Sequence, residues 1–162
     1  MIIRPATAQD APAICAIWNP VIRDTLATFN SVEKTPDDIT AMLSEKATQG
    51  HAFLLAEAEN TILGFATFGQ FRGGIGYAHT FEHTIILGDQ ARGRGVGRAL
   101  MTALEDAART AGGHSLFAGV SAGNPAGVAF HRALGFQEVA TLPEVGRKFD
   151  RWLDLVLLQK LL

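Results

Sequence analysis

A run of alternating glycine and arginine residues carries the clearest chemical signal in this sequence. Residues 92–98 read Arg-Gly-Arg-Gly-Val-Gly-Arg, and an apolar pattern of helical period begins inside the run and ends before residues 112–113. The free amides and the positive dipole end at a helix start bind anions, and glycines let a phosphate approach the main chain. Arginine side chains add charge-assisted hydrogen bonds. The pattern therefore predicts a phosphate site formed by Arg92, Gly93, Arg94, Gly95, Val96, Gly97 and Arg98.

Two common phosphate-binding motifs fit this run poorly. A Rossmann loop opens the first strand-helix unit and needs an acidic residue at the end of the next strand, whereas this run lies past mid-chain and the next expected strand ends without an acid. A triphosphate loop needs Lys and Ser or Thr after its last glycine, where this chain has Arg98 and Ala99. A flexible turn with solvated arginines remains open from the pattern alone.

The elements around the run follow from hydrophobic periodicity and from capping residues. We expect one helix that starts near Thr7 and ends before Pro20, and a second that starts at Thr35-Pro36 and stops at Gly50. A later helix should be capped by Asn124 and end at residue 135. Strands are expected at residues 2–3, 51–57, 62–68, 77–87, 115–121 and 151–162, with a turn at residues 59–60. This order predicts a mixed α/β sheet.

The composition limits the class of protein. The chain has 162 residues, of which 48% are hydrophobic, so we expect a single domain over residues 1–162. Its net charge of −2 does not favour nucleic acid as a partner. The only cysteine, Cys15, excludes an internal disulfide and suits a reducing cytoplasm. No signal peptide and no apolar run of membrane-spanning length are present, so we expect a cytoplasmic protein that binds no membrane.

Two segments resemble the cofactor motifs of the GCN5-related N-acetyltransferases. Residues 92–97 match Gln/Arg-x-x-Gly-x-Gly/Ala, and residues 124–136 are similar to the second motif, with Gly127 where alanine is usual. Residues 80–84, 130–136 and 143–155 resemble the phosphinothricin and methionine sulfoximine acetyltransferases, so the resemblance covers essentially the whole chain. It implies the α/β (α+β) fold of that superfamily, a mixed, mostly antiparallel sheet of about seven strands flanked by about four helices.

The same resemblance implies acetyl-CoA as the cofactor. The amides of residues 93–98 would bind its pyrophosphate, and Asn124 would both cap its helix and reach the pantetheine arm. The strand before the loop would part from its neighbour, so that its main chain pairs with the pantetheine through Ile85, Ile86 and Leu87. The N–H of Leu87 would stabilise the oxyanion. No metal is expected, because no pair of histidines has the spacing of a zinc motif.

Two residues are candidates for proton transfer by this resemblance. Glu82 is the expected base for the acceptor amine, and the alternative is a glutamate that only organises the site or pairs with a neighbouring histidine. His131 stands seven residues after Asn124, where many relatives have a tyrosine, and the only tyrosine here is Tyr77. The sequence leaves open whether His131 protonates the thiolate or only forms hydrogen bonds within the site.

The acceptor is expected to be a small amino-acid-like amine of the phosphinothricin, methionine sulfoximine or methionine sulfone type. The candidate substrate residues by this resemblance are Arg72, Gly73, Gly74, Tyr77 and His79. Arg72 would bind the carboxylate of the acceptor, but Ala78 stands where near relatives often have arginine, so one cation is missing. The alternatives are another amine, such as a polyamine, a peptide N-terminus or an antibiotic, or a non-catalytic acyl-CoA sensor. Relatives are commonly homodimers, so we expect a homodimer. We expect Trp18, Phe29 and Phe71 to pack in the core, and the alternative is that they line an acceptor pocket.

Overall fold

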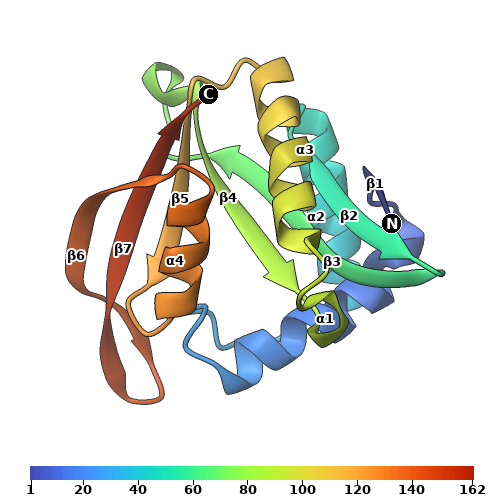
Figure 1. The fold of residues 1–162 in the computed structure, drawn as a ribbon, viewed down its shortest axis with the longest axis horizontal. Helices are drawn as coiled ribbons and strands as arrows, with labels where there is room; N and C mark the ends of the chain where they lie inside the picture. Colours follow the sequence, from blue (N-terminus) through green and yellow to red (C-terminus); the bar gives the residue numbers. More distant parts are fainter.

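Seven strands form a single mixed sheet in the computed structural model, which describes residues 1–162 (Figure 1). Their order across the sheet is β1-β2-β3-β4-β5-β7-β6. Every neighbouring pair is antiparallel except β4 and β5, which confirms the expected mixed, mostly antiparallel sheet. The strands are β1 (Ile2–Pro5), β2 (Phe53–Ala58), β3 (Thr61–Gln70), β4 (Thr80–Leu87), β5 (Ser115–Ser121), β6 (Gln137–Lys148) and β7 (Arg151–Leu161).

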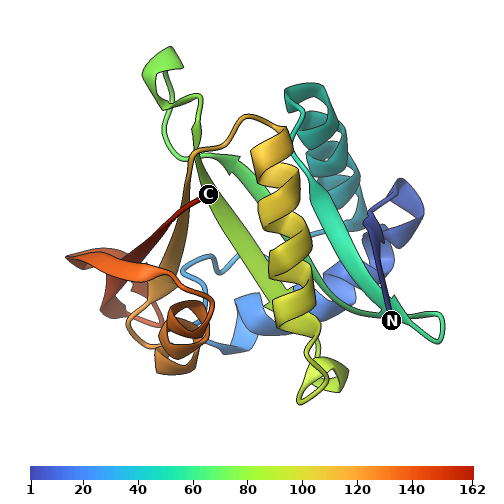
Figure 2. The same ribbon diagram turned by 45° about the horizontal axis from the view of Figure 1, so that its top comes forward.

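Helices cover both faces of the first half of the sheet. They are α1 (Ala11–Asp24), α2 (Pro36–Gln49), α3 (Val96–Thr110) and α4 (Pro125–Ala133), the four that were expected. Successive residues of β3 point to opposite faces. Phe65 belongs to the core cluster beneath α1 and α2, whereas Ala66 belongs to the larger cluster beneath α3 (Figure 2). None of these helices is both long and apolar enough to cross a membrane.

The first helix continues through Pro20, so the expectation that it ends before this residue is wrong. A proline inside a helix removes the hydrogen bond to the carbonyl four residues earlier, here that of Ala16. Both residues are exposed, so water can bond to this carbonyl. Beyond the proline, Ile22 is completely buried and holds the last turn against the protein. Tertiary packing therefore outweighs the local preference of proline.

The fourth strand begins at Thr80, three residues later than expected from Tyr77. The residues before it form a short 3-10 turn, Ile75–Tyr77. The backbone N–H of Tyr77 donates to Gly74 (3.1 Å) and that of Ala78 donates to Ile75 (3.2 Å). These amides are used within the turn, so they are not available to a strand ladder.

The parallel strands β4 and β5 pair over only half of their length. Their register runs from Thr80 opposite Ser115 to His83 opposite Ala118. Beyond that point β4 continues to Leu87 while β5 continues to Ser121 without pairing to it, and the two strands diverge (Figure 1). This fork confirms that the strand before the glycine loop parts from its neighbour, and it leaves one edge of β4 without a partner.

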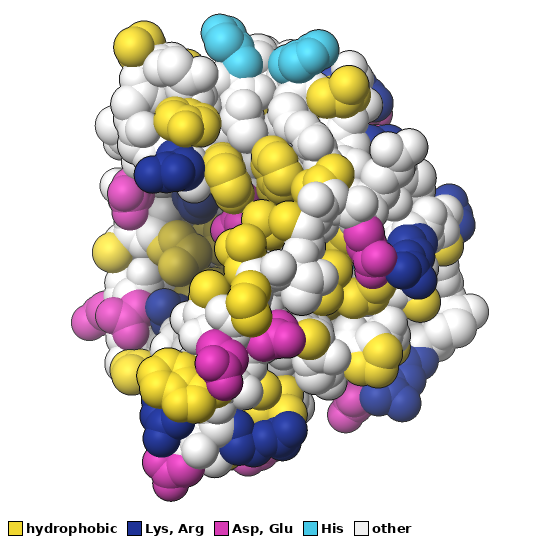
Figure 3. Space-filling model, turned by 90° about the vertical axis from the view of Figure 1, so that its left-hand side faces the viewer, with side chains coloured by type: hydrophobic (Ala, Val, Ile, Leu, Met, Phe, Trp, Pro, Cys, Tyr) yellow, Lys and Arg dark blue, Asp and Glu magenta, His cyan; other side chains and the backbone are white.

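The side of the molecule formed by β6 and β7 exposes many apolar side chains. Figure 3 views the molecule from this side and shows them gathered across the middle of the surface, around a hollow. The large exposed apolar residues of this hairpin and its turn are Val139, Leu142, Val145, Phe149, Trp152 and Leu161.

Candidate active site

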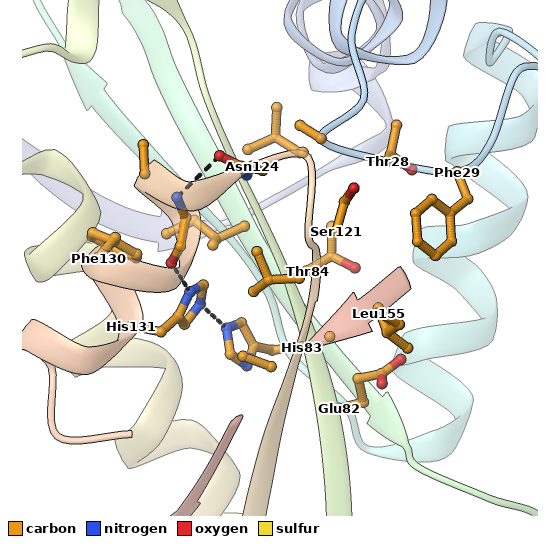
Figure 4. A pocket seen from close by; sticks show the side chains of 18 of the residues that line it. Thr28, Phe29, Glu82, His83, Thr84, Ser121, Asn124, Phe130, His131 and Leu155 are labelled. Atoms are coloured by element: carbon orange, nitrogen blue, oxygen red, sulfur yellow. Dashed lines mark hydrogen bonds between the residues drawn. The ribbon is translucent and has the colours of Figure 1, made fainter. Parts of the chain in front are cut away.

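The fork between β4 and β5 opens into a cavity of about 620 Å³ (Figure 4). Its walls come from most of β4, from β5, from α4, from the loop that joins α1 to α2, and from single residues of α1 and β7. No lysine or arginine lines it. The sequence-predicted residues that line the cavity are Glu82, Ile85, Ile86, Leu87, Asn124 and His131.

Glu82 is the only carboxylate in the lining of this cavity. It lies opposite Gly69 on β3 and Phe117 on β5, at the closed end of the fork. Gly119 leaves room for it, because a Cβ at that position would lie 3.3 Å from the Oε2 atom of Glu82. Burial raises the pKa of Glu82 above its usual range. A carboxylate in this setting is a stronger base than one in water.

Two buried histidines meet beside the fork. The Nε2 atom of His83 lies 2.9 Å from the Nε2 atom of His131, and the Nδ1 atom of His131 lies 2.7 Å from the carbonyl oxygen of Gly127. Because a carbonyl only accepts, the Nδ1 atom of His131 carries the proton and donates to Gly127. The Nε2 atom of the neutral His131 ring is then an acceptor, and His83 donates to it. Both ring nitrogens of His131 are thus bonded within the protein.

Both histidines are neutral near pH 7. Burial, together with the neighbouring His131, lowers the pKa of His83 to about 3. Burial also lowers the pKa of His131. Neither ring therefore carries an extra proton under physiological conditions.

Asn124 caps α4, as expected. Its side-chain oxygen accepts a hydrogen bond from the backbone N–H of Gly127 (3.0 Å). A Cβ at residue 127 would lie 2.5 Å from the Nδ2 atom of Asn124 and 3.0 Å from Val120. Glycine at position 127 therefore leaves the space that the Asn124 side chain needs in its capping orientation.

The glycine and arginine run forms a strand-to-helix turn, as predicted. Gly93 and Gly95 adopt positive φ angles of 70° and 71°, which glycine reaches without strain, and Gly95 precedes the first residue of α3. The first bond into the helix is donated by Ala99 to Gly95, so the amides of residues 96–98 face outward without an internal acceptor. Leu87, which lines the cavity, also lies against this turn, because a Cβ at Gly97 would be 3.2 Å from its side chain. Residues 92–98 do not line the cavity themselves, but Leu87 lies both in its lining and beside the glycine turn.

Comparison with known proteins identifies this arrangement. Residues 18–136 match the model of the acetyltransferase (GNAT) family. The chain belongs to this family. It is 39% identical over 161 residues to an L-methionine sulfoximine/L-methionine sulfone acetyltransferase of Pseudomonas aeruginosa, which covers 97% of this chain and 92% of the relative. The protein is therefore an N-acetyltransferase.

Two solved structures share the GNAT fold of this chain over nearly all of its length. One is a ribosomal-protein-alanine N-acetyltransferase from Brucella melitensis, with a TM-score of 0.96, 41% identity and 100% of both chains covered. The other is a putative acetyltransferase from Salmonella typhimurium with its cofactor acetyl-CoA, with a TM-score of 0.94 and 35% identity; 99% of this chain and 93% of that one are covered.

The predicted substrate residues lie outside the cavity of this GNAT domain. Arg72, Gly73 and Gly74 line a separate polar hollow together with Lys46. The guanidinium of Arg72 lies over the ring of Tyr77, 5.6 Å from its centre. The Nδ1 atom of His79 lies 2.6 Å from the carbonyl oxygen of Gly112, at the far end of α3. All five predicted substrate residues lie in the connection between β3 and β4. This connection contains the 3-10 turn and ends where β4, the strand that carries Glu82, begins.

The loop between α1 and α2 supplies a wall of the GNAT cavity through residues that include Phe29, and α1 adds Trp18. These two side chains line the cavity, so the expectation of packing alone is wrong for them, although Trp18 also lies 4.9 Å from Phe65 in the core. The buried ammonium group of Lys148 on β6 donates to the carbonyls of Thr25 (2.6 Å) and Thr28 (2.9 Å) and so holds this loop in place. No sequence signal pairs a lysine with carbonyls more than one hundred residues away.

Proposed function

We propose that this GNAT protein transfers the acetyl group of acetyl-CoA to the amine of a small amino-acid-like acceptor of the methionine sulfoximine, methionine sulfone or phosphinothricin type. One observation carries the proposal: the unpaired edge of β4 runs between the glycine turn at the start of α3 and Glu82, the only carboxylate that lines the cavity. The name of the Pseudomonas aeruginosa relative supports this class of acceptor.

The unpaired edge of β4 is suited to the pantetheine arm of the cofactor. Gly88 donates its N–H to Leu63 on β3 (2.8 Å), and successive residues of a strand point their backbone groups to opposite edges. The backbone groups of Ile85 and Leu87 therefore point into the fork, while those of Ile86 point to β3. We assign the pantetheine to this edge and the pyrophosphate to the turn formed by residues 92–98. The N–H of Leu87, expected from the sequence to face the thioester oxygen, lies beside the glycine turn and about 16 Å along the strand from Glu82. We therefore assign the donor for the thioester oxygen to the N–H of Ile85, which also points into the fork and lies closer to Glu82.

Acetyl transfer in this site proceeds by direct attack. The neutral amine attacks the thioester carbonyl, a C–N bond forms, the C–S bond breaks and coenzyme A leaves as a thiolate, which takes a proton from solvent. Glu82 accepts a proton from the amine, directly or through one water. His131 was the candidate acid for the thiolate, but both of its ring nitrogens are already bonded, and we assign it to the hydrogen-bond network.

The acceptor class is tested by measuring thiol release with acetyl-CoA and a panel of amines. Methionine sulfoximine, methionine sulfone and phosphinothricin should give higher kcat/KM values than spermidine, an aminoglycoside or a peptide that begins with alanine. The peptide is the second candidate, because the Brucella melitensis structure is named for that activity. A preference for the peptide would overturn the proposed acceptor. Binding of acetyl-CoA without thiol release for any amine would support a sensor and contradict the enzymatic proposal.

We also infer a homodimer, formed through the side of β6 and β7. Contiguous apolar surface of this kind is typical of interaction sites. Sedimentation velocity should give about twice the chain mass of 17.3 kDa, and Trp152→Glu, at a residue that is 59% exposed, should shift the protein to the monomer. A monomeric wild type would contradict the inference. The binding of the acceptor carboxylate by Arg72, and a cytoplasmic location, stay predictions from the sequence.

A further inference from the structure

The pair formed by His83 and His131 lies at the point where the fork opens. His83 is the last residue of β4 that pairs with β5, and His131 faces it from the last turn of α4 (Figure 4). The two side chains are enclosed by aromatic rings, since Phe136 lies 5.5 Å from His83 and 5.3 Å from His131, and Phe130 lies 5.1 Å from His131. The pair therefore links two walls of the cavity, β4 and α4, through buried side chains.

A continuous set of hydrogen bonds connects this pair to the start of α4. His83 donates to His131, His131 donates to the carbonyl of Gly127, and the N–H of Gly127 donates to Asn124. Each bond has a definite direction, because the carbonyl of Gly127 and the side-chain oxygen of Asn124 only accept. The position of Asn124 is thus coupled to β4 through three bonds.

The pair carries a cost that apolar side chains would avoid. The Nδ1 atom of His83 is buried and has no hydrogen-bond partner. A buried polar atom without a partner destabilises a fold, whereas two apolar side chains would fill the same space without this penalty. Apolar side chains would not, however, set the rotation of α4 relative to β4, because van der Waals contacts have little directional preference.

We propose that His83 and His131 are positioning residues that hold the N-terminal turn of α4, with Asn124, against the fork and thereby set the width of the cleft for the pantetheine arm. The proposal rests on the proposed cofactor site. Neither ring exchanges a proton with the substrate in this role. The pair acts through Asn124 and the backbone of α4, and its effect is on the affinity for acetyl-CoA.

The test compares acetyl-CoA affinity, measured by isothermal titration calorimetry, among variants of the pair. His83→Phe and His131→Phe should each raise the Kd for acetyl-CoA by about tenfold, and the double variant should be no weaker than either single one, because each substitution already breaks the same link. His131→Gln should recover much of the affinity, since its amide can accept from His83 and donate to Gly127. The pH profile of kcat should keep its shape in all of these variants.

A matched control is available in the same core. His51 is also packed against aromatic rings, 5.3 Å from both Phe68 on β3 and Phe81 on β4, and its Nδ1 atom is likewise buried without a partner, so it has no hydrogen bond through that atom to α4. His51→Phe should leave the affinity for acetyl-CoA unchanged. This control separates the loss of a buried histidine from the loss of the link to Asn124.

Several outcomes would overturn the proposal. Wild-type affinity in His83→Phe, or additive losses in the double variant, would show that the two rings do not act as a unit. A His131→Gln variant that binds acetyl-CoA normally but loses kcat, together with the fall of kcat at high pH that a proton donor gives the wild type, would make His131 a proton donor. If the phenylalanine variants do not fold, as judged by circular dichroism, the smaller His83→Leu and His131→Leu variants, which also cannot form the link, give the same comparison. A wild-type protein that does not bind acetyl-CoA would instead refute the proposed cofactor site itself.

Discussion

Replacing Glu82 by glutamine should lower kcat by about 100- to 10,000-fold and leave the affinity for acetyl-CoA nearly unchanged. Glutamine fills the same space beside Gly119 but cannot take a proton from the amine. Steady-state thiol release measures kcat, and calorimetric titration measures the affinity. Glu45→Gln, at an exposed residue of α2, is the matched control and should behave as wild type.

The pH dependence gives a second readout of the same residue. A base must be ionised, so kcat/KM falls as the pH drops through its pKa. Because burial raises the pKa of Glu82 above the usual value of 4.5, the fall should occur above that pH. Glu82→Gln should abolish this limb of the profile. A glutamine variant that keeps wild-type turnover across the pH range would remove Glu82 from the mechanism.

Replacing Lys148 by methionine should raise the KM for the acceptor by about tenfold and lower the free energy of unfolding by about 1–3 kcal/mol. The substitution leaves the carbonyls of Thr25 and Thr28 without their donor, and it releases the loop that carries Phe29 over the cavity. The affinity for acetyl-CoA should change less than the KM for the acceptor, because Asn124 is held by its own bond to Gly127 and not by Lys148. Kinetics with varied acceptor, together with urea unfolding, measure both effects.

Lys160→Met provides the control for the loss of a lysine that bonds to a backbone carbonyl. Lys160 donates to the carbonyl of Leu134 (2.9 Å) and to Glu105, and none of these residues lines the cavity. The Lys160→Met variant should lower the free energy of unfolding without changing the KM for the acceptor. An unchanged acceptor KM in Lys148→Met would mean that the loop between α1 and α2 does not shape the acceptor site.

The features predicted correctly from the sequence are those set by short-range interactions. Glu59 and Asn60 both adopt positive φ angles in the expected turn, and Asn124 makes the expected bond to an amide three residues later. The helix that starts within the glycine run depends on an apolar period that can be read directly. Each of these features involves residues that are close in the chain, so the residue types alone specify them.

The features that the sequence did not predict depend on contacts between distant residues. Pro20 stays within α1 because Ile22 is buried by the folded protein. The role of Lys148 depends on carbonyls at the opposite end of the chain. The partner of His83 comes from α4, and neither residue type nor spacing indicates that pair. In the same way, the resemblance to the family pointed to Glu82, which does line the cavity, but it could not reveal that Arg72 lies outside the cavity of one chain.

The most direct test is a crystal structure of the protein with acetyl-CoA bound. We expect the pyrophosphate within hydrogen-bonding distance of the amides of residues 93–98, and the pantetheine paired with the backbone of Ile85 and Leu87 in the fork. The thioester oxygen should face the N–H of Ile85, with its carbon on the side of Glu82. Acetyl-CoA bound away from the fork, or with its thioester on the far side of the sheet from Glu82, would contradict the proposed site.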